Sequence, residues 1–395
     1  MNPGPPRLAI VLSHPVQYYS PWFRWLRAHT PLEFRVFYLW DFGVTARRDP
    51  QFAATFQWDV DLLEGYDSEF VPNVSSDPGT HHFRGLDNPE LTGRVAAWRP
   101  GAVLLFGYNW LSLRRARRWA RGHSIPLVFR GDSHLLGRSR WALLRGLLLR
   151  LLYRQFAAVT YTGAANRDYF RAFGVPDRKL FFAPHAVDAE RFAASAPAAR
   201  IRAESLRAEL GLAGRRVVLF AGKFTGAKQP GALLRAFLQV ATPADALVFV
   251  GDGAEKANLI ALAGAHPSAC VRFLPFANQS EMPARYLLAD IFALPSRGSY
   301  ETWGLAINEA MHLGLPCLVS DRVGCQRDLV QPGETGWVFP ADDPSALATT
   351  LRQALRTPPE EMRRLGSNVL TRISRYTYRE TTAGLLAALT SLGSP

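Results

Sequence analysis

The stretch of sequence that decides the fold reads SRGSYETWGLAINEAMHLGLPCLVSD and covers residues 296–321. Glu301 and Glu309 stand eight residues apart in it, and Gly304 comes just before apolar residues at helical spacing. A helix over 303–313 would separate the two carboxylates by about 12 Å, and its free N–H groups would lie between them. A helix N-terminus favours a diphosphate, and carboxylates accept hydrogen bonds from paired hydroxyls. The pattern predicts either a site for a ligand with these groups or a surface helix with two solvated glutamates.

Apolar segments of strand length alternate with segments of helical length on both sides of this stretch. In the second half, the sequence predicts strands at 216–221, 246–250, 270–274, 291–294, 316–320 and 336–339, with helices at 230–240, 254–265, 281–289 and 304–313. In the first half, it predicts strands within 6–16 and at 35–40, 102–106, 126–130 and 157–161, with helices at 20–29, 90–98, 111–122 and 140–155. Two such series predict an α/β protein with two doubly wound, Rossmann-like domains facing a central cleft.

The change from one series to the next falls at 181–192, where an apolar strand ends in a proline turn. Segment 41–89 is rich in Asp, Gly and aromatic residues, shows little periodicity, and is expected to be loops. We therefore expect an N-terminal domain, a C-terminal domain and a last helix that packs back on the first domain, at residues 1–188, 189–375 and 376–395.

The composition is that of a globular protein with two or three domains. The chain has 395 residues, of which 48% are hydrophobic, and this excludes disorder as its main state. No apolar run approaches the ~20 residues that span a bilayer, and the start, MNPGPPRLAIVLSHPV, lacks the features of a signal peptide. Cys270, Cys317 and Cys325 have no metal-ligand spacing and are expected to be reduced thiols. These features predict a cytoplasmic protein.

The net charge of +13 is concentrated in one part of the chain. Residues 101–150 hold ten arginines and a single acid, Asp132. Four of the arginines share one face of the helix expected at 111–122, namely Arg114, Arg117, Arg118 and Arg121. A leucine-rich segment with further arginines follows at 138–156. The two segments predict either a solvated helix and a core helix, or a surface that docks on an anionic membrane.

Lysine is rare, and its positions are informative. Of the 46 basic residues only four are lysines, and two of these, Lys223 and Lys228, fall in AGKFTGAK at 221–228. A strand that leads into a glycine-containing loop with two ammonium groups is suited to holding a diphosphate, although an exposed turn explains the pair equally well. The loop does not fit the P-loop pattern, and no GxGxxG follows the first strand.

The tract ETWGLAINE at 301–309, followed by AMHLGLPCLVSD, resembles the E-x7-E motif of the retaining GT-B glycosyltransferases of family four. Further similar tracts occur in the family's order: HAVD with Arg191 and Phe192, AGKFTGAKQP, VGDG, VRFLPF, ADIFALPS and GCQRDLVQPGETGWVFPADD. The resemblance covers most of 181–343, whereas in the first domain SHPVQYYSPWFRWL replaces the usual glycine-rich loop. It implies a GT-B fold and transfer of a sugar from a nucleotide-sugar donor, with retained anomeric configuration.

The resemblance also implies roles for individual residues. Glu309 would hold the ribose hydroxyls, and Glu301 would contact hydroxyls of the donor sugar. Lys223, where many relatives carry Arg, and Lys228 would neutralise the leaving diphosphate. The other donor contacts that it implies are Gly222, Thr302, Trp303, Gly304 and Leu305 and, around the base, Phe273, Leu274, Pro275, Phe276 and Met282.

The counterpart in the first domain is LVFRGDSH at 127–134. Similar enzymes carry a His or an Asp near the reacting carbon here, which makes Asp132 and His134 candidates beside Glu301 and the two lysines. His14, in the first loop, and Asp132 are expected to face the acceptor.

These observations predict a retaining hexosyltransferase that acts on a glycan, lipid-linked or small-molecule acceptor. We expect no cofactor and no metal, because the two lysines supply positive charge. We expect no nucleic-acid partner. We expect the protein in the cytoplasm and, as a peripheral protein, at the inner face of a membrane. Two alternatives stay open: a nucleotide-sugar epimerase on a similar scaffold, and a basic nucleic-acid-binding protein.

Overall fold

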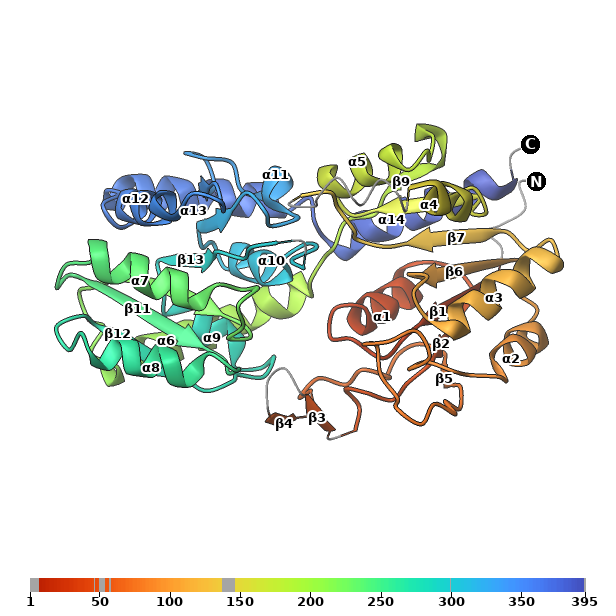
Figure 1. Ribbon diagram of the computed structural model, residues 1–395, viewed down its shortest axis with the longest axis horizontal. Helices are drawn as coiled ribbons and strands as arrows, with labels where there is room; N and C mark the ends of the chain where they lie inside the picture. The colour runs from red at the N-terminus through yellow and green to blue at the C-terminus, as the bar shows by residue number, and fades with distance from the viewer. Residues whose placement is uncertain are drawn as a thin grey trace.

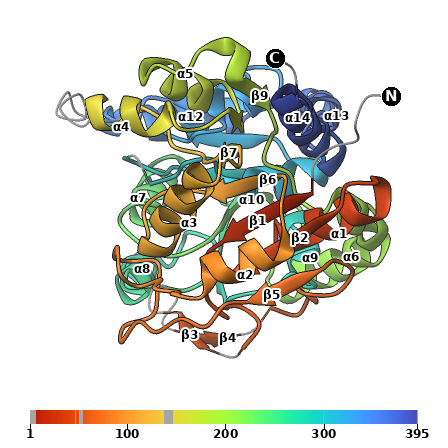
Figure 2. The same cartoon turned by 90° about the vertical axis from the view of Figure 1, so that its right-hand side faces the viewer.

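The fold consists of two parallel α/β domains joined side by side, as the two views in Figure 1 and Figure 2 show. This computed structural model describes residues 7–45, 47–49, 54–56, 58–136, 146–298 and 300–393. None of the helices in these ranges has both the length and the hydropathy that a membrane span requires.

The N-terminal domain is built on a seven-stranded sheet in which all neighbouring strands are parallel. Its spatial order is β5 (Ser68–Phe70), β2 (Phe34–Tyr38), β1 (Leu8–Leu12), β6 (Ala102–Phe106), β7 (Leu127–Arg130), β8 (Ala158–Tyr161) and β9 (Leu180–Phe182). The helices that follow its strands are α1 (Ser20–His29), α2 (Leu91–Trp98), α3 (Leu111–Gly122), α4 (Gly146–Tyr153) and α5 (Ala164–Ala172). The order reverses beside β1, which is the position where doubly wound sheets bind ligands.

The C-terminal domain repeats this plan with six parallel strands. Their order is β12 (Val271–Leu274), β11 (Asp245–Val250), β10 (Arg216–Ala221), β13 (Ile291–Leu294), β14 (Cys317–Ser320) and β15 (Gly336–Phe339). Its helices are α6 (Ala189–Glu209), α7 (Pro230–Val240), α8 (Lys256–Gly264), α9 (Met282–Leu287), α10 (Leu305–His312), α11 (Gln326–Leu329), α12 (Pro344–Leu355) and α13 (Pro359–Ile373). Counted along the chain, the strands lie in the order 3-2-1-4-5-6 of a Rossmann domain.

Continuous apolar strands explain why both sheets are covered on both faces. In β10, Val217 and Leu219 enter one core cluster, whereas Val218 and Phe220 enter another on the opposite face. The residues of β1 divide between two clusters of the N-terminal domain in the same way. Buried parallel strands require such runs, because helices pack on each side of the sheet.

The last helix, α14 (Tyr378–Thr390), lies on the N-terminal domain, against β8, β9 and α1. The indole of Trp22 donates a hydrogen bond of 2.9 Å to Thr382, and Thr381 donates one of 2.7 Å to the Pro184 carbonyl. Helix and strand approach so closely that a Cβ on Gly384 would lie 1.8 Å from the Phe182 carbonyl oxygen. The chain therefore crosses between the domains twice, before α6 and again before α14.

Three sequence predictions need correction. Segment 41–89 is not loop throughout, because β5 extends the main sheet and β3 (Arg47–Asp49) pairs with β4 (Ala54–Phe56). The helix expected at 303–313 begins two residues later, at Leu305. No helix was expected at α5 or at α11, which has only four residues.

Candidate active site

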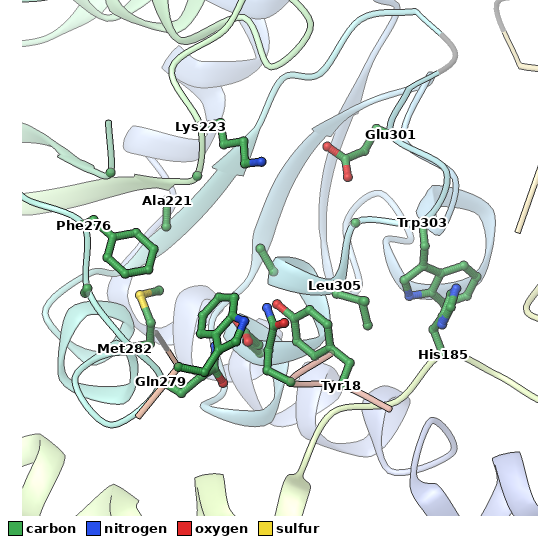
Figure 3. A pocket seen from close by; sticks show the side chains of 18 of the residues that line it. Tyr18, His185, Ala221, Lys223, Phe276, Gln279, Met282, Glu301, Trp303 and Leu305 are labelled. Atoms are coloured by element: carbon green, nitrogen blue, oxygen red, sulfur yellow. The ribbon is translucent and has the colours of Figure 1, made fainter. Parts of the chain in front are cut away.

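A cavity of about 430 Å³ lies between the two domains, at the carboxyl ends of the central strands of both sheets. The C-terminal domain contributes the last residues of β10 and β11, Ala221 and Val250, and the N-terminus of α10. The N-terminal domain contributes the loop after β1 and the loop after β7, represented by His14 and Asp132. Figure 3 shows side chains from both domains facing this space. A doubly wound sheet places its ligand at this edge.

Glu309 forms the buried end of the cavity lining, on the second turn of α10. Its residue is only 3% exposed, and the Tyr286 hydroxyl donates a hydrogen bond of 2.7 Å to Oε2. The other oxygen, Oε1, is buried and has no hydrogen-bond partner among the described residues. Burial raises the pKa of the Glu309 carboxyl, and the hydroxyl groups of Tyr286 and Tyr18 and the charge of Arg191 oppose this shift. A buried acceptor without a partner is costly, so this oxygen is suited to a donor supplied by a ligand.

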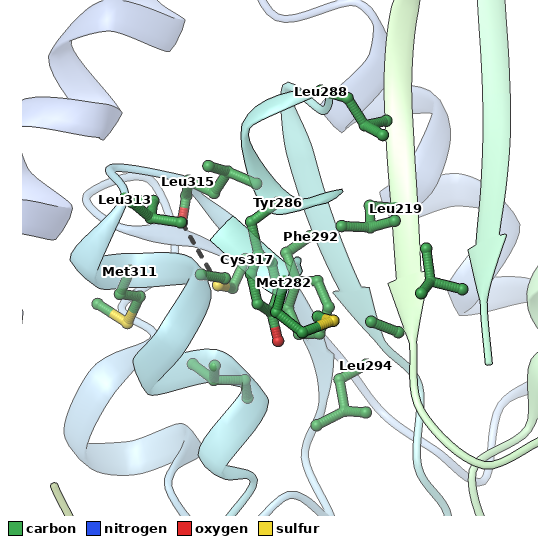
Figure 4. Close-up of a cluster of buried hydrophobic side chains, with 14 of the residues drawn as sticks. Leu219, Met282, Tyr286, Leu288, Phe292, Leu294, Met311, Leu313, Leu315 and Cys317 are labelled. Carbon is green, nitrogen blue, oxygen red and sulfur yellow. Dashed lines mark hydrogen bonds between the residues drawn. The ribbon is translucent and has the colours of Figure 1, made fainter. Parts of the chain in front are cut away.

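The aromatic partner of Glu309 is fixed by the core of the C-terminal domain. Tyr286 is fully buried among Leu219, Leu294 and Cys317, in the cluster that Figure 4 shows. Its ring meets that of Phe292 edge-on, with 5.5 Å between centroids. The hydroxyl therefore has a fixed direction, which holds the Glu309 carboxylate in one orientation.

Glu301 lies in the loop before α10 and pairs with Lys228. Its Oε2 also accepts a hydrogen bond of 2.9 Å from the Ser296 hydroxyl, and its side chain is 11% exposed. Lys223 comes from the end of β10, and its ammonium group points toward Glu301 in Figure 3. The two lysines and one carboxylate thus gather on one side of the cavity.

The start of α10 is open to the cavity because of Gly304. This residue precedes the helix with φ +104°, in the left-handed region. A Cβ here would approach Val323 to 3.1 Å and Leu294 to 3.2 Å. Gly304, Leu305 and the next residue, Ala306, all line the cavity, so backbone at the positive end of the helix dipole faces it.

Asp132 is a charged residue of the N-terminal domain that lines the cavity. Its Oδ2 accepts a hydrogen bond of 2.8 Å from Thr302 and lies 3.5 Å from Nε2 of His185. Withdrawal from solvent would raise the pKa of the Asp132 carboxyl, but the nearby imidazole of His185 and the hydrogen bond from Thr302 lower it to about 2. Burial lowers the pKa of His185. Asp132 is therefore an anion at neutral pH and holds an uncharged imidazole beside the cavity.

His14 lies in the same wall, within an aromatic environment. Its ring meets Trp40 and Phe42 edge-on, at centroid distances of 5.8 and 5.5 Å, and its Nδ1 is 3.0 Å from the Ser13 hydroxyl. Burial lowers the pKa of His14 to about 4, so the ring is neutral at neutral pH. A neutral imidazole can donate one hydrogen bond and accept another.

A segment of the N-terminal domain reaches across the opening to the C-terminal domain. Trp58 and Phe276 both line the cavity, and their ring centroids are 6.2 Å apart. The next residue, Asp59, accepts a hydrogen bond of 3.1 Å from the Ser280 backbone and another from the Ser280 hydroxyl. The backbone N–H of Asp59 donates one of 3.3 Å to Asn278. We call residues 58 and 59 the cross-cleft segment.

The structure brings most of the sequence-predicted residues to the cavity, but not all. His134 does not line it: the side chain is buried, and Nε2 lies 3.1 Å from the backbone oxygen of Glu301. Phe273, Leu274 and Pro275 do not line it either: Phe273 stacks on Phe249, and Leu274 packs against a core cluster of the C-terminal domain. The predicted residues that do line it are His14, Asp132, Gly222, Lys223, Lys228, Phe276, Met282, Glu301, Thr302, Trp303, Gly304, Leu305 and Glu309.

Sequence reasoning missed several lining residues: Tyr18, Trp58, His185, Gln279 and Tyr286. His185 had a signal, because it opens the tract HAVD that was noted for its resemblance. Gln279 had none, since its place depends on Arg191, which donates hydrogen bonds to its carbonyl and side-chain oxygens at 2.8 and 2.7 Å.

Known proteins resemble both the sequence and the fold. The model of the family described as glycosyl transferases group 1 matches residues 203–372. A D-inositol 3-phosphate glycosyltransferase of Mycolicibacterium gilvum is 32% identical over 337 residues, which cover 78% of this chain and 72% of that protein. A GDP-mannose-dependent phosphatidylinositol monomannoside mannosyltransferase of Mycolicibacterium smegmatis is 31% identical over 53% of this chain. That match spans about half, 56%, of the relative's length.

Solved structures share the architecture over nearly the whole chain. Alr3699/HepE of Anabaena, in complex with UDP and glucose, has a TM-score of 0.70 at 17% identity, covering 96% of this chain and 98% of that one. A UDP-forming trehalose-phosphate synthase of Burkholderia xenovorans has a TM-score of 0.74 at 14% identity, covering 98% and 100%. The two Rossmann-like domains have the GT-B arrangement. On the fold and on the similarity to the Mycolicibacterium gilvum enzyme, the chain belongs to the group 1 glycosyl transferases.

Proposed function

We propose that this protein transfers a hexosyl group from a nucleotide-sugar donor to an acceptor hydroxyl with retention of anomeric configuration. The observation that carries the proposal is the pair of carboxylates around the start of α10, with a partnerless oxygen on Glu309. The names of the relatives support it, because the Mycolicibacterium smegmatis enzyme depends on GDP-mannose and HepE binds UDP-glucose.

In this proposal the donor lies along the C-terminal wall of the cavity. The ribose hydroxyls donate hydrogen bonds to Glu309, and the base packs beside Phe276 and Met282. The diphosphate lies at the N-terminus of α10, where the helix dipole and the two lysines stabilise its charge. Glu301 accepts hydrogen bonds from hydroxyls of the sugar.

In this proposal, donor binding replaces the ion pair between Lys228 and Glu301 with contacts from each residue to the donor. Without a donor, the Glu301 carboxylate and the Lys228 ammonium group balance each other's charge, and both are mostly withdrawn from solvent. When the donor enters, its diphosphate supplies the anion for Lys228, and its sugar hydroxyls supply donors for Glu301. The site therefore keeps both groups paired before and after binding.

Catalysis in this proposal is mainly electrostatic. The bond between the anomeric carbon and the diphosphate oxygen breaks as the acceptor oxygen bonds to that carbon from the same face. The leaving diphosphate takes the acceptor's proton and is stabilised by Lys223, Lys228 and the start of α10. Asp132, held by His185 and Thr302, stabilises positive charge on the sugar ring from the opposite domain.

A donor panel tests this function and separates it from the alternatives. The protein is incubated with UDP-, GDP- and ADP-hexoses and candidate acceptors, and release of nucleoside diphosphate and the product's proton spectrum are recorded. Acceptor-dependent release with an anomeric coupling that matches the donor supports the proposal. Conversion of the donor's own sugar without an acceptor would instead identify an epimerase, and inverted products would overturn retention.

We also propose that α3 and α4 form a surface that docks on an anionic membrane. On α4, Leu147 and Leu148 are 67% and 70% exposed, and Leu151 is 48% exposed. The arginine face of α3 lies beside it, since Gln155, just after α4, accepts hydrogen bonds from Arg117 and Arg121. Exposed leucines beside a basic face are typical of surfaces that enter the headgroup region. Residues 137–145, part of the segment noted at 138–156, lie outside the described residues.

A further inference from the structure

Two histidines and an aspartate converge in the loop between β5 and α2, away from the cavity. Asp77, His81 and His82 each offer one ligand atom, and these atoms lie within 4.8 Å of one another. None of the three lines the cavity between the domains. Imidazole nitrogens and a carboxylate oxygen form the donor set that Zn²⁺ uses most often outside cysteine sites.

The distances between these atoms match the geometry of a tetrahedral ion. Oδ2 of Asp77 lies 3.0 Å from Nε2 of His81 and 3.3 Å from Nε2 of His82. Zn²⁺ bonds of about 2.0–2.1 Å at tetrahedral angles separate neighbouring ligand atoms by about 3.3 Å. An ion that binds all three groups would replace the contacts of Asp77 Oδ2 and also the hydrogen bond of 3.0 Å from Nε2 of His82 to the Asp77 backbone oxygen. The ligand atoms lie within 4.8 Å of one another, so shifts of the side chains bring them around one ion.

The loop is held in shape by contacts that do not involve the three side chains. Gly79 and Gly85 are joined by a backbone hydrogen bond of 3.1 Å, and the Asn73 amide donates one of 2.9 Å to the Gly85 carbonyl. A Cβ on Gly79 would lie 2.5 Å from Nδ1 of His81, so the turn leaves room for this ring only because residue 79 is glycine. Pre-formed ligands lower the entropic cost of binding an ion.

The same loop is tied to the first turn of α3. The indole of Trp110 donates a hydrogen bond of 3.2 Å to the Thr80 carbonyl, and the backbone of Leu111 donates one of 2.9 Å to Phe83. An ion bound to residues 77, 81 and 82 would therefore stiffen the loop after β5 and its contacts with the first turn of α3. Both lie at the carboxyl ends of the strands, which face the cleft.

We propose that Asp77, His81 and His82 form a binding site for Zn²⁺, with water completing the coordination. Asp77 is the anionic ligand, and its Oδ2 lies within 3.3 Å of Nε2 of both imidazoles. The two imidazoles supply Nε2, and the ligands are exposed enough for solvent to take the open positions. The site is independent of sugar transfer and of the donor cavity.

The test uses the full-length, tag-free protein after treatment with a chelator. Zn²⁺ is titrated by calorimetry, and Co²⁺ is titrated by visible spectroscopy because tetrahedral Co²⁺ absorbs much more strongly than the octahedral aqueous ion. We expect one ion per chain, a tetrahedral Co²⁺ spectrum and an increase in unfolding temperature with added Zn²⁺. His81→Ala and His82→Ala should each weaken Zn²⁺ binding by more than about 10-fold and remove the Co²⁺ spectrum.

His123→Ala is the matched control, since His123 is an exposed histidine just after α3, and its ring contacts the Trp119 carbonyl and indole. It should leave Zn²⁺ affinity unchanged. Asp77→Asn keeps the size of the side chain but removes its charge, so it should weaken Zn²⁺ binding. Because the side chain keeps its size, this variant distinguishes the loss of a ligand from a loop that misfolds. Absence of stoichiometric binding would overturn the proposal, and so would a loss of affinity in His123→Ala equal to that in His81→Ala.

Discussion

The two walls of the cavity are built in different ways. The C-terminal wall comes mostly from two short tracts, 221–228 and 301–309, that follow adjacent strands of one sheet. The N-terminal wall is assembled from positions as far apart as His14, Trp58, Asp132 and His185. The first wall is built from residues close in sequence, whereas the second depends on tertiary structure. Under the proposed function, this contrast teaches that the donor contacts are encoded locally and that the contacts with the acceptor are not.

The largest effect is expected from the ammonium group of the charged wall. Lys228→Ala should lower kcat by about 1,000-fold, or about 4 kcal/mol, because the preorganised positive charge that stabilises the leaving group is lost. Steady-state kinetics with the donor found by the panel measures this. Lys256→Ala is the control, since this lysine pairs with Asp252 outside the cavity lining. Equal kcat in Lys228→Ala and the control would contradict the assigned role of the C-terminal wall.

The basic face of the N-terminal domain should give the next largest effect. Replacing Arg114, Arg118 and Arg121 together by Gln should weaken binding to vesicles rich in anionic lipid by about 3 kcal/mol, at about 1 kcal/mol per charge. Co-sedimentation at several salt concentrations measures this.

The matched control for this change replaces three exposed arginines of the C-terminal half, Arg352, Arg363 and Arg375. These residues should leave vesicle binding nearly unchanged. Equal losses in the two triple variants would show that net charge, and not this surface, controls binding.

Glu309 should show opposite effects on stability and on donor binding. Burial raises its pKa in the folded state, so the folded protein loses stability as pH rises from the ordinary carboxyl range through that raised value. Glu309→Gln removes this loss and should raise the unfolding temperature at neutral pH, with no gain at low pH. The same change should raise the donor KM by about 10-fold, or about 1.4 kcal/mol.

Thermal unfolding across pH and steady-state kinetics together measure the two effects of Glu309→Gln. A variant that loses both stability and donor binding would contradict the account, because it would identify Glu309 as a structural residue.

The smallest effect concerns the cross-cleft segment, where the two walls meet. Asp59→Ala removes hydrogen bonds to Ser280 that are exposed, so the donor KM should rise only about 3-fold. A double-mutant cycle with Ser280→Ala should be non-additive, because both changes remove the hydrogen bond from the Ser280 hydroxyl to Asp59, whereas only Asp59→Ala also removes the bond from the Ser280 backbone. Additive effects in the cycle would show that the two walls bind the donor independently.

The difference between the walls also explains what could be predicted from the sequence. Periodicity predicted both sheets and most helices, since continuous apolar strands such as β10 leave few alternatives. The tract around Glu301 and Glu309 predicted much of the C-terminal wall. It placed Glu301 before the helix, but it could not predict the first residue of the helix, because Gly304 at φ +104° delays the start to Leu305.

The remaining failures have tertiary causes. His134 stands two residues after Asp132, but it turns into the protein and meets the Glu301 backbone, which no spacing could reveal. Phe273 belongs to a tract assigned to the base, yet its ring stacks on Phe249 within the domain. Trp58 comes from a segment with little periodicity, and only the folded chain brings it beside Phe276.

The most direct test of the central claim is calorimetric titration of UDP, GDP and ADP into the wild type, Lys228→Ala and Glu309→Gln. The account predicts one site per chain for at least one nucleotide and at least about 10-fold weaker binding in each variant. It also predicts that the corresponding nucleoside without phosphate loses the dependence on Lys228 and keeps the dependence on Glu309. Nucleotide binding that neither substitution changes would contradict the claim that these two residues hold the donor.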